Sequence, residues 1–133
     1  METINHECYV SLEIAKLLKE AGFDWKCNGV FLSEDGTQYA FIKADAACDN
    51  NNTKYNPYNI SAPTLDVAQR WLRETHNLHI TIFSSSQESW MFRITKPHEK
   101  LENGVYGEDF YTYEEAQEVG IKKALELILE KGE

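Results

Sequence analysis

Several side chains in this sequence could together hold a planar or anionic ligand. Arg93 and His79 lie in two short segments with alternating apolar residues, and Arg73 lies in the segment before them. Tyr55 and Tyr58 lie in a polar stretch further upstream. A guanidinium, an imidazole and aromatic rings can bind a flat or phosphorylated molecule by stacking and paired hydrogen bonds. We therefore name Arg93, His79, Tyr58, Tyr55 and Arg73 as candidate ligand-binding residues.

An ordinary structural interpretation of this region is the plainer one. Arg70 stands four residues after Asp66 and four before Glu74, a spacing that suits ion pairs along a helix surface. The tyrosines would then fix the loop in which they lie, and the outer strand face would pack against a helix.

The histidines and cysteines do not have the spacing of a metal or catalytic motif. They are His6, His76, His79, His98, Cys8, Cys27 and Cys48. A zinc site needs three or four convergent ligands, and an expected helix end separates His76 from His79. No cysteine has a local neighbour that marks it as an activated nucleophile. We expect no metal and no cofactor, and name no catalytic residue.

The charge balance restricts the classes of partner. The chain has 133 residues with 13 Lys and Arg against 22 Asp and Glu, giving a formal net charge of −9. Non-specific binding to nucleic acid depends on neutralising phosphates with Lys and Arg, so we expect neither direct nucleic-acid binding nor an anionic membrane partner. No apolar stretch approaches the ~20 residues needed to span a bilayer. The N-terminus lacks a secretion-signal pattern and the cysteine count is odd, so we expect a cytoplasmic protein with free thiols.

The first half of the chain contains a helix and a hairpin. In "SLEIAKLLKEAGF" the apolar residues Ile14, Leu17, Leu18 and Ala21 recur at helical spacing, and Ser11 can cap the helix start. In "GVFLSEDGTQYAFIK" two β-rich runs flank a turn signal, which predicts a hairpin. The polar, Asn-rich stretch that follows predicts a long loop at about 44–60.

The second half alternates between helical and strand periods. Leu65, Ala68, Trp71 and Leu72 share a helix face. The period then changes to two, and this predicts strands with an inner and an outer face. The expected inner residues are Ile80, Ile82, Trp90, Phe92 and Ile94, and the outer residues are His79, Thr81, Phe83, Met91, Arg93 and Thr95.

The end of the chain predicts a further helix with a defined start. Thr112 and Glu115 have capping-box spacing. Gly120 lies inside this helix, where it costs roughly 1 kcal/mol against Ala unless close packing requires it. An additional strand is expected near Val105 to Tyr111.

These elements predict an α+β protein. We expect an antiparallel sheet built from hairpins, with three helices packed on one face, because hairpin-linked strands pair antiparallel. With no linker or internal repeat, residues 1–133 are expected to form a single domain.

Three blocks of the sequence resemble a known group of proteins. They are "YVSLEIAKLLKEAGFDWKC", "SAPTLDVAQRWLRETHNLHI" and "YTYEEAQEVGIKKALELI". Together they resemble a group of small uncharacterised proteins common in gut Bacteroides-type bacteria and their phages and prophages. The resemblance implies a phage or mobile-element origin and a host-cytoplasmic setting, and it assigns no functional residue.

These observations suggest a non-enzymatic accessory binding protein of a phage or prophage. A counter-defence role would take one of two forms: capture of a nucleotide-like signal, with pockets in a homo-oligomer, or the blocking of a host defence protein. Two alternatives from other classes are a small enzyme with an unrecognised His or Cys site and a component of virion assembly.

Overall fold

Helices and strands follow the order that the hydrophobic spacing predicts. The computed structural model describes residues 8–48, 57–84, 89–99 and 105–130. Its helices in these ranges are α1 (Leu12–Glu20), α2 (Leu65–His76) and α3 (Tyr113–Glu130). Its strands are β1 (Cys27–Leu32), β2 (Ala40–Cys48), β3 (Ile60–Ser61), β4 (His79–Ser84), β5 (Trp90–Thr95) and β6 (Val105–Phe110). The α+β class and the expected additional strand, β6, are confirmed.

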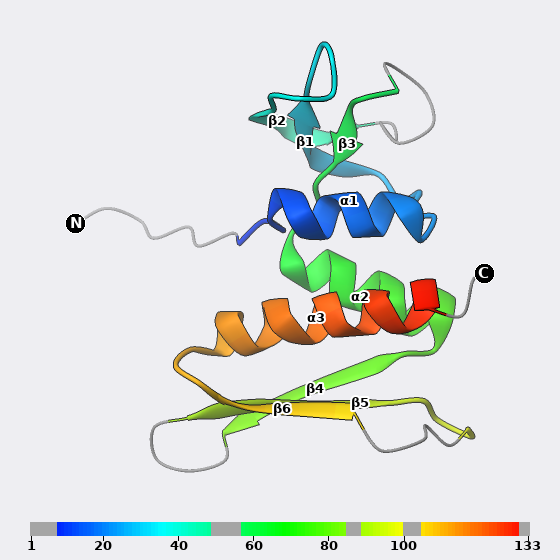
Figure 1. Cartoon of the computed structure of the whole chain (residues 1–133), viewed down its shortest axis with the longest axis vertical. Helices are drawn as coiled ribbons and strands as arrows, with labels where there is room; N and C mark the ends of the chain where they lie inside the picture. Colours follow the sequence, from blue (N-terminus) through cyan, green and yellow to red (C-terminus); the bar gives the residue numbers. More distant parts are fainter. Residues whose placement is uncertain (1–7, 49–56, 85–88, 100–104, 131–133) are drawn as a thin grey trace.

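The strands form two antiparallel sheets instead of one. Three strands pair in the order β2-β1-β3, and three pair in the order β4-β5-β6. All three helices lie on one side of the β4-β5-β6 sheet, and the other sheet lies beyond α1 (Figure 1). Helix α2 follows β3 directly and its 12 residues carry the chain about 18 Å before β4 begins. It connects β3 of one sheet to β4 of the other within the helical layer between them (Figure 1).

Each helix begins with a hydroxyl cap. Ser11 Oγ accepts from the Ile14 amide at 3.2 Å, and Thr64 Oγ1 accepts from the Val67 amide at 3.3 Å. In α3, Thr112 Oγ1 accepts from the Glu115 amide at 3.0 Å, as the capping-box spacing predicts. These bonds satisfy amides that have no partner within the helix.

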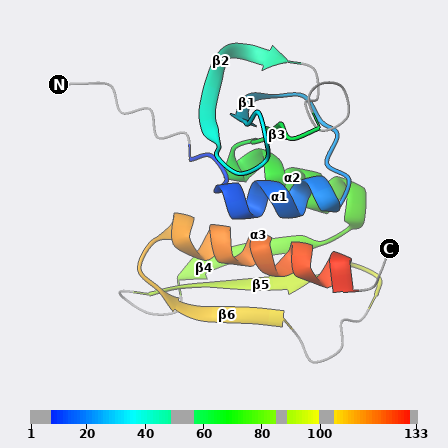
Figure 2. The same ribbon diagram turned by 45° about the horizontal axis from the view of Figure 1, so that its top comes forward.

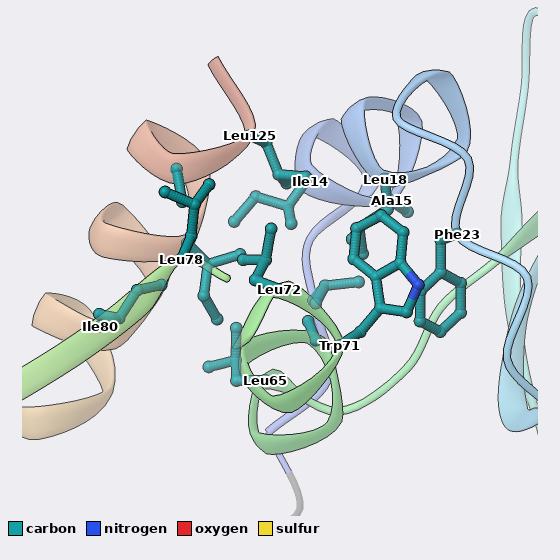
Figure 3. Close-up of a cluster of buried hydrophobic side chains, with 14 of the residues drawn as sticks. Ile14, Ala15, Leu18, Phe23, Leu65, Trp71, Leu72, Leu78, Ile80 and Leu125 are labelled. Carbon is teal, nitrogen blue, oxygen red and sulfur yellow. The ribbon is translucent and has the colours of Figure 1, made fainter. Parts of the chain in front are cut away.

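The main core lies between α1, α2 and α3. Trp71 is its largest buried side chain, with 1% of its surface exposed. Its indole ring packs against Phe23 with ring centroids 5.4 Å apart. Figure 3 shows the indole reaching from α2 towards α1, with Leu72 and Leu125 on the side of α3. The apolar stripes of all three helices therefore converge on one cluster.

The Phe92 ring packs against two glycines, Gly107 of the neighbouring strand β6 and Gly120 of α3. A Cβ atom on Gly107 would lie 2.5 Å from Phe92 Cε2, and one on Gly120 would lie 3.1 Å from Phe92 Cγ. The ring also stacks on Phe110, with centroids 5.9 Å apart. The prediction that close packing explains a glycine inside the last helix is confirmed.

Two local expectations differ from the structure. The long loop predicted at about 44–60 is wrong at its two ends, because β2 continues to Cys48 and β3 begins at Ile60; residues 49–56 lie outside the described residues. The ion pair of Arg70 forms with Glu74, at 2.9 Å. Asp66 instead accepts a hydrogen bond from Gln117 of α3, at 2.7 Å, because the start of α2 faces α3.

Candidate functional site

The outer face of the β4-β5-β6 sheet lies opposite the helices (Figure 1). The alternation of side chains along each strand builds this face. Its residues on β4 and β5 are His79, Thr81, Phe83, Met91, Arg93 and Thr95. The inward neighbours Ile80, Phe92 and Ile94 are all buried. The predicted division of these strands into an inner and an outer face is confirmed.

An aromatic and cationic row crosses the centre of this face. Arg93 pairs in register with Thr81 on one side and with Tyr106 on the other. Its guanidinium carbon lies 5.8 Å from the centre of the Phe83 ring, which is within cation–π range. Tyr106 has 61% of its surface exposed. The outer face, defined as the six residues above together with Tyr106, therefore presents an arginine between two aromatic rings.

The structure brings two of the five candidate residues onto one surface. His79 and Arg93 share the outer face on adjacent strands, two residues apart in register. Arg73 lies on the exposed side of α2, in the helical layer behind the sheet. Tyr58 lies beside the other sheet and contacts the β1–β2 turn, where a Cβ atom on Gly36 would be 2.9 Å from its ring. Tyr55 lies outside the described residues.

A hollow of about 550 Å³ lies beside the β1–β2 turn. Internal hydrogen bonds already occupy several of its polar groups. Ser33 Oγ accepts from the Gly36 amide at 2.8 Å, and Asn59 Oδ1 accepts from the Ser33 amide at 3.3 Å. The amide and hydroxyl of Thr37 both donate to Asp35 and lower the pKa of this carboxyl. These contacts explain the shape of the turn without a ligand.

A second hollow, of about 400 Å³, lies where α2 and α3 begin. Its wall includes Cys8, Asp66 and Gln117. Gln117 is 2% exposed, and its amide nitrogen donates to Asp66 at 2.7 Å and to Gln69 at 2.8 Å. Gln69 in turn donates to the Ile80 carbonyl of β4 at 2.8 Å. This chain of bonds joins both helices to the sheet and indicates a structural role.

His76 is a partly buried titratable group at the end of α2. Its ring lies edge-on to Trp71, with centroids 4.9 Å apart. Among the described residues, neither His76 Nε2 nor Trp71 Nε1 has a hydrogen-bond partner, although both atoms are buried. Burial, together with the charge of Lys96, lowers the pKa of His76. The neutral form of this imidazole is therefore favoured in the folded protein.

Metal sites and membrane-spanning segments are two further possibilities for the described part of the chain. Within those residues, no three His, Cys, Asp or Glu side chains come close enough together to hold a metal ion. None of the helices there is long and apolar enough to cross a membrane.

Sequence reasoning did not single out Tyr106 as a site residue. Its outward position follows from the pairing of β6 with β5. The sequence signal for the outward position of Tyr106 was short. It consisted of the pair "VY" at the start of β6, in which an apolar residue is followed by one with a polar hydroxyl. The alternation stops at Gly107 and the acids after it, so the strand was only weakly marked.

Comparison of the sequence and the fold with family models, curated proteins and solved structures found no match.

Proposed function

We propose that the protein is a non-enzymatic binding protein that docks another protein on its outer face. One observation carries the proposal. The chain has a net charge of −9, yet the six outward residues of β4 and β5 include no acid and do include Arg93. The acids Glu108 and Asp109 lie on the edge strand β6, at the border of this face. The centre of this face therefore differs in charge from the acidic protein as a whole, and such a difference is typical of a surface that recognises another molecule.

The residue types on the outer face match those of protein interfaces. Interface cores are enriched in Tyr, Phe, Met and Arg and depleted in Glu and Asp. Phe83 and Met91 are directly opposite each other in register, and Arg93 is opposite Tyr106. Arginine and tyrosine also dominate the few positions that supply most of the binding free energy.

The breadth of this face favours a macromolecular partner over a small ligand. Small-molecule sites are usually concave and enclose most of the ligand. The two hollows described above are lined by other residues, none of them on the outer face. A face spread over three strands is better suited to contact with a protein surface.

The resemblance to proteins of Bacteroides-type phages and prophages bears on the identity of the partner. Under that origin, the partner would be a protein of the bacterial host, and docking would block it. A counter-defence role of the blocking kind is therefore part of the proposal.

A quantitative affinity purification tests this function. Tagged wild-type protein and the variants Arg93→Glu and Tyr106→Ala would be incubated with lysate of a Bacteroides host. The matched control is Lys123→Glu, which makes the same change of charge at a half-exposed position of α3. We expect one host protein to bind the wild type and the control, and both outer-face variants to lose at least nine-tenths of it.

Two results would contradict the proposal. One is a bound protein that the outer-face variants retain as well as the control does. The other is a nucleotide-sized mass carried by the purified wild type in native mass spectrometry and lost in Arg93→Glu. That result would assign the face to capture of a small signal molecule.

A further inference from the structure

Strand β2 is the outer strand of the β2-β1-β3 sheet (Figures 1 and 2). On one side it pairs with β1, and no other described strand pairs with its far edge. Phe41 and Ile42 lie at consecutive positions and so point to opposite faces of the sheet. They are 40% and 46% exposed. As far as the described residues go, the strand therefore offers an open backbone edge with apolar side chains on both faces.

The two outer strands of the other sheet carry protective features, whereas the register shift of β2 begins only after Lys43. On β4, the side chain of Gln69 donates to the Ile80 carbonyl at 2.8 Å and so occupies that edge. On β6, the backbone of Asp109 has a φ of 71°, and a register shift interrupts the strand beside two exposed acids. Bulges and charges of this kind prevent pairing with another strand.

Lys43, one of the charged residues of β2, is placed where it protects the edge less. Lys43 lies next to Ile42, and a lysine on an edge strand usually discourages pairing. Here its ammonium group lies 5.9 Å from the centre of the Tyr9 ring. This position holds the charge over the inner face of the sheet, beside Phe41, whose ring centroid is 5.0 Å from that of Tyr9.

We propose that β2 pairs antiparallel with β2 of a second copy of the chain, across a two-fold axis at Ile42. In this arrangement, side chains on the inner face of one subunit meet side chains on the inner face of the other, and the same holds for the outer faces. Ile42 then meets Ile42 of the partner subunit on the outer face. Phe41 meets Lys43 of the partner subunit on the inner face, where the cation can lie against the ring. The segment is thus complementary to itself, and the two sheets would join into one of six strands.

The geometry limits the strength of this dimer. Regular pairing with β1 covers Ala40 to Lys43 before a register shift displaces the following residues. The new contact would therefore be short, well below the area of a permanent interface. The net charge of −9 on each copy opposes association, and salt screens this repulsion. Dimerisation should consequently depend on protein concentration and become stronger as salt is raised.

Sedimentation equilibrium over a range of protein concentrations provides the first test. The variant Ile42→Lys would place two like charges opposite each other at the axis, which destabilises a strand pair. Its matched control is Leu32→Lys, at a position 38% exposed on the central strand β1. We expect the wild type and the control to form dimers, and Ile42→Lys to dimerise at least tenfold more weakly. Circular dichroism checks that each variant is folded.

Disulfide trapping provides a test that does not depend on weakening the contact. Directly opposed residues of antiparallel strands have Cα atoms about 4.5–5.5 Å apart, within the range that a disulfide can bridge. Under mild oxidation, Ile42→Cys should give a covalent dimer. The wild type and Leu32→Cys measure the background from the native cysteines.

Several outcomes would overturn the proposal. They are a wild type that stays monomeric at every concentration, larger aggregates without a discrete dimer, and Ile42→Cys cross-linking no faster than Leu32→Cys. A dimer that persists in Ile42→Lys and is lost in Arg93→Glu would assign self-association to the outer face. Because the two surfaces differ, failure here leaves the docking function to its own test.

Discussion

Gly120 of α3 lies directly against the ring of Phe92 of β5, at a distance where a methyl group would fit only if its neighbours shifted by a few tenths of an ångström. The Cβ of an alanine there would be 3.1 Å from Phe92 Cγ and 3.1 Å from Ile80 Cγ2. Phe92 is 2% exposed and also touches Gly107, so its ring has little space in which to move. The helix therefore approaches the sheet as closely as its backbone allows.

Gly120→Ala should lower the free energy of unfolding although alanine favours helices. Overpacking a core typically costs about 1–3 kcal/mol, against a gain of about 1 kcal/mol in helix propensity. We expect a net loss on the order of 1 kcal/mol by urea unfolding. The neighbouring control Val119→Ala, at a position 38% exposed, should be neutral or slightly stabilising. Stabilisation by Gly120→Ala would show that the contact can relax.

Trp71→Ala should destabilise the protein severely, because it empties the centre of the core. The expected loss is about 3–5 kcal/mol in chemical unfolding. Trp71→Phe should cost clearly less. It keeps a ring beside Phe23, and the indole nitrogen has no hydrogen-bond partner in the described part of the chain. Equal losses for the two variants would mean that the indole forms a contact that a phenyl ring cannot replace.

Arg93 and Ile94 are adjacent residues with opposite expected effects on stability. Arg93→Ala removes an exposed cation–π contact with Phe83, worth about 0.5–1 kcal/mol. The melting temperature should therefore change little. Ile94 is 2% exposed, and Ile94→Ala should cost about 2–5 kcal/mol. A large loss for Arg93→Ala would show that this arginine holds the sheet together and is not reserved for a partner.

His76 should make the folded protein less stable as the pH falls. Burial and the charge of Lys96 lower the pKa of His76 below its ordinary value. In the unfolded chain the imidazole binds a proton at a pH near about 6.5, so the unfolded state takes up the proton first. Stability is therefore complete above this pH and declines below it.

The variant His76→Phe isolates this contribution from that of the carboxylates. It keeps a ring against Trp71 and removes the titration. Urea unfolding at pH 7.5, 6.5 and 5.5 should show a smaller decline for the variant than for the wild type. Parallel declines would indicate that protonation of His76 has no effect on folding.

The features predicted correctly from the sequence are those set by neighbouring residues. The capping hydroxyls of Ser11 and Thr112 act on amides three residues away. The sharing of one face by His79 and Arg93 follows from a period of two along two paired strands. Such local rules need no knowledge of the rest of the fold.

The features that sequence reasoning missed depend on distant pairing. Alternation predicts the two faces of a strand and does not identify its neighbours, so the division into two sheets could not be foreseen. The end of β2 reads "ADAAC", which is poor in β-branched and aromatic residues, and Cys48 is a strand residue through its pairing with Cys27. For the same reason, Tyr58 and Arg73 looked like neighbours of Arg93 and lie on other surfaces.

The contact between α1 and α3 has a consequence for the order in which the chain can fold. The apolar face of α1, which includes Ile14 and Leu18, is buried in the cluster that Leu125 of α3 completes (Figure 3). On the ribosome, α1 emerges long before α3, so this face lacks part of its native cover until nearly all of the described chain has been synthesised. By contrast, the elements from α2 to α3 follow one another in the sequence. Contacts between them close only short loops, so they can form quickly. A nascent chain stalled before α3 should therefore present α1 to chaperones.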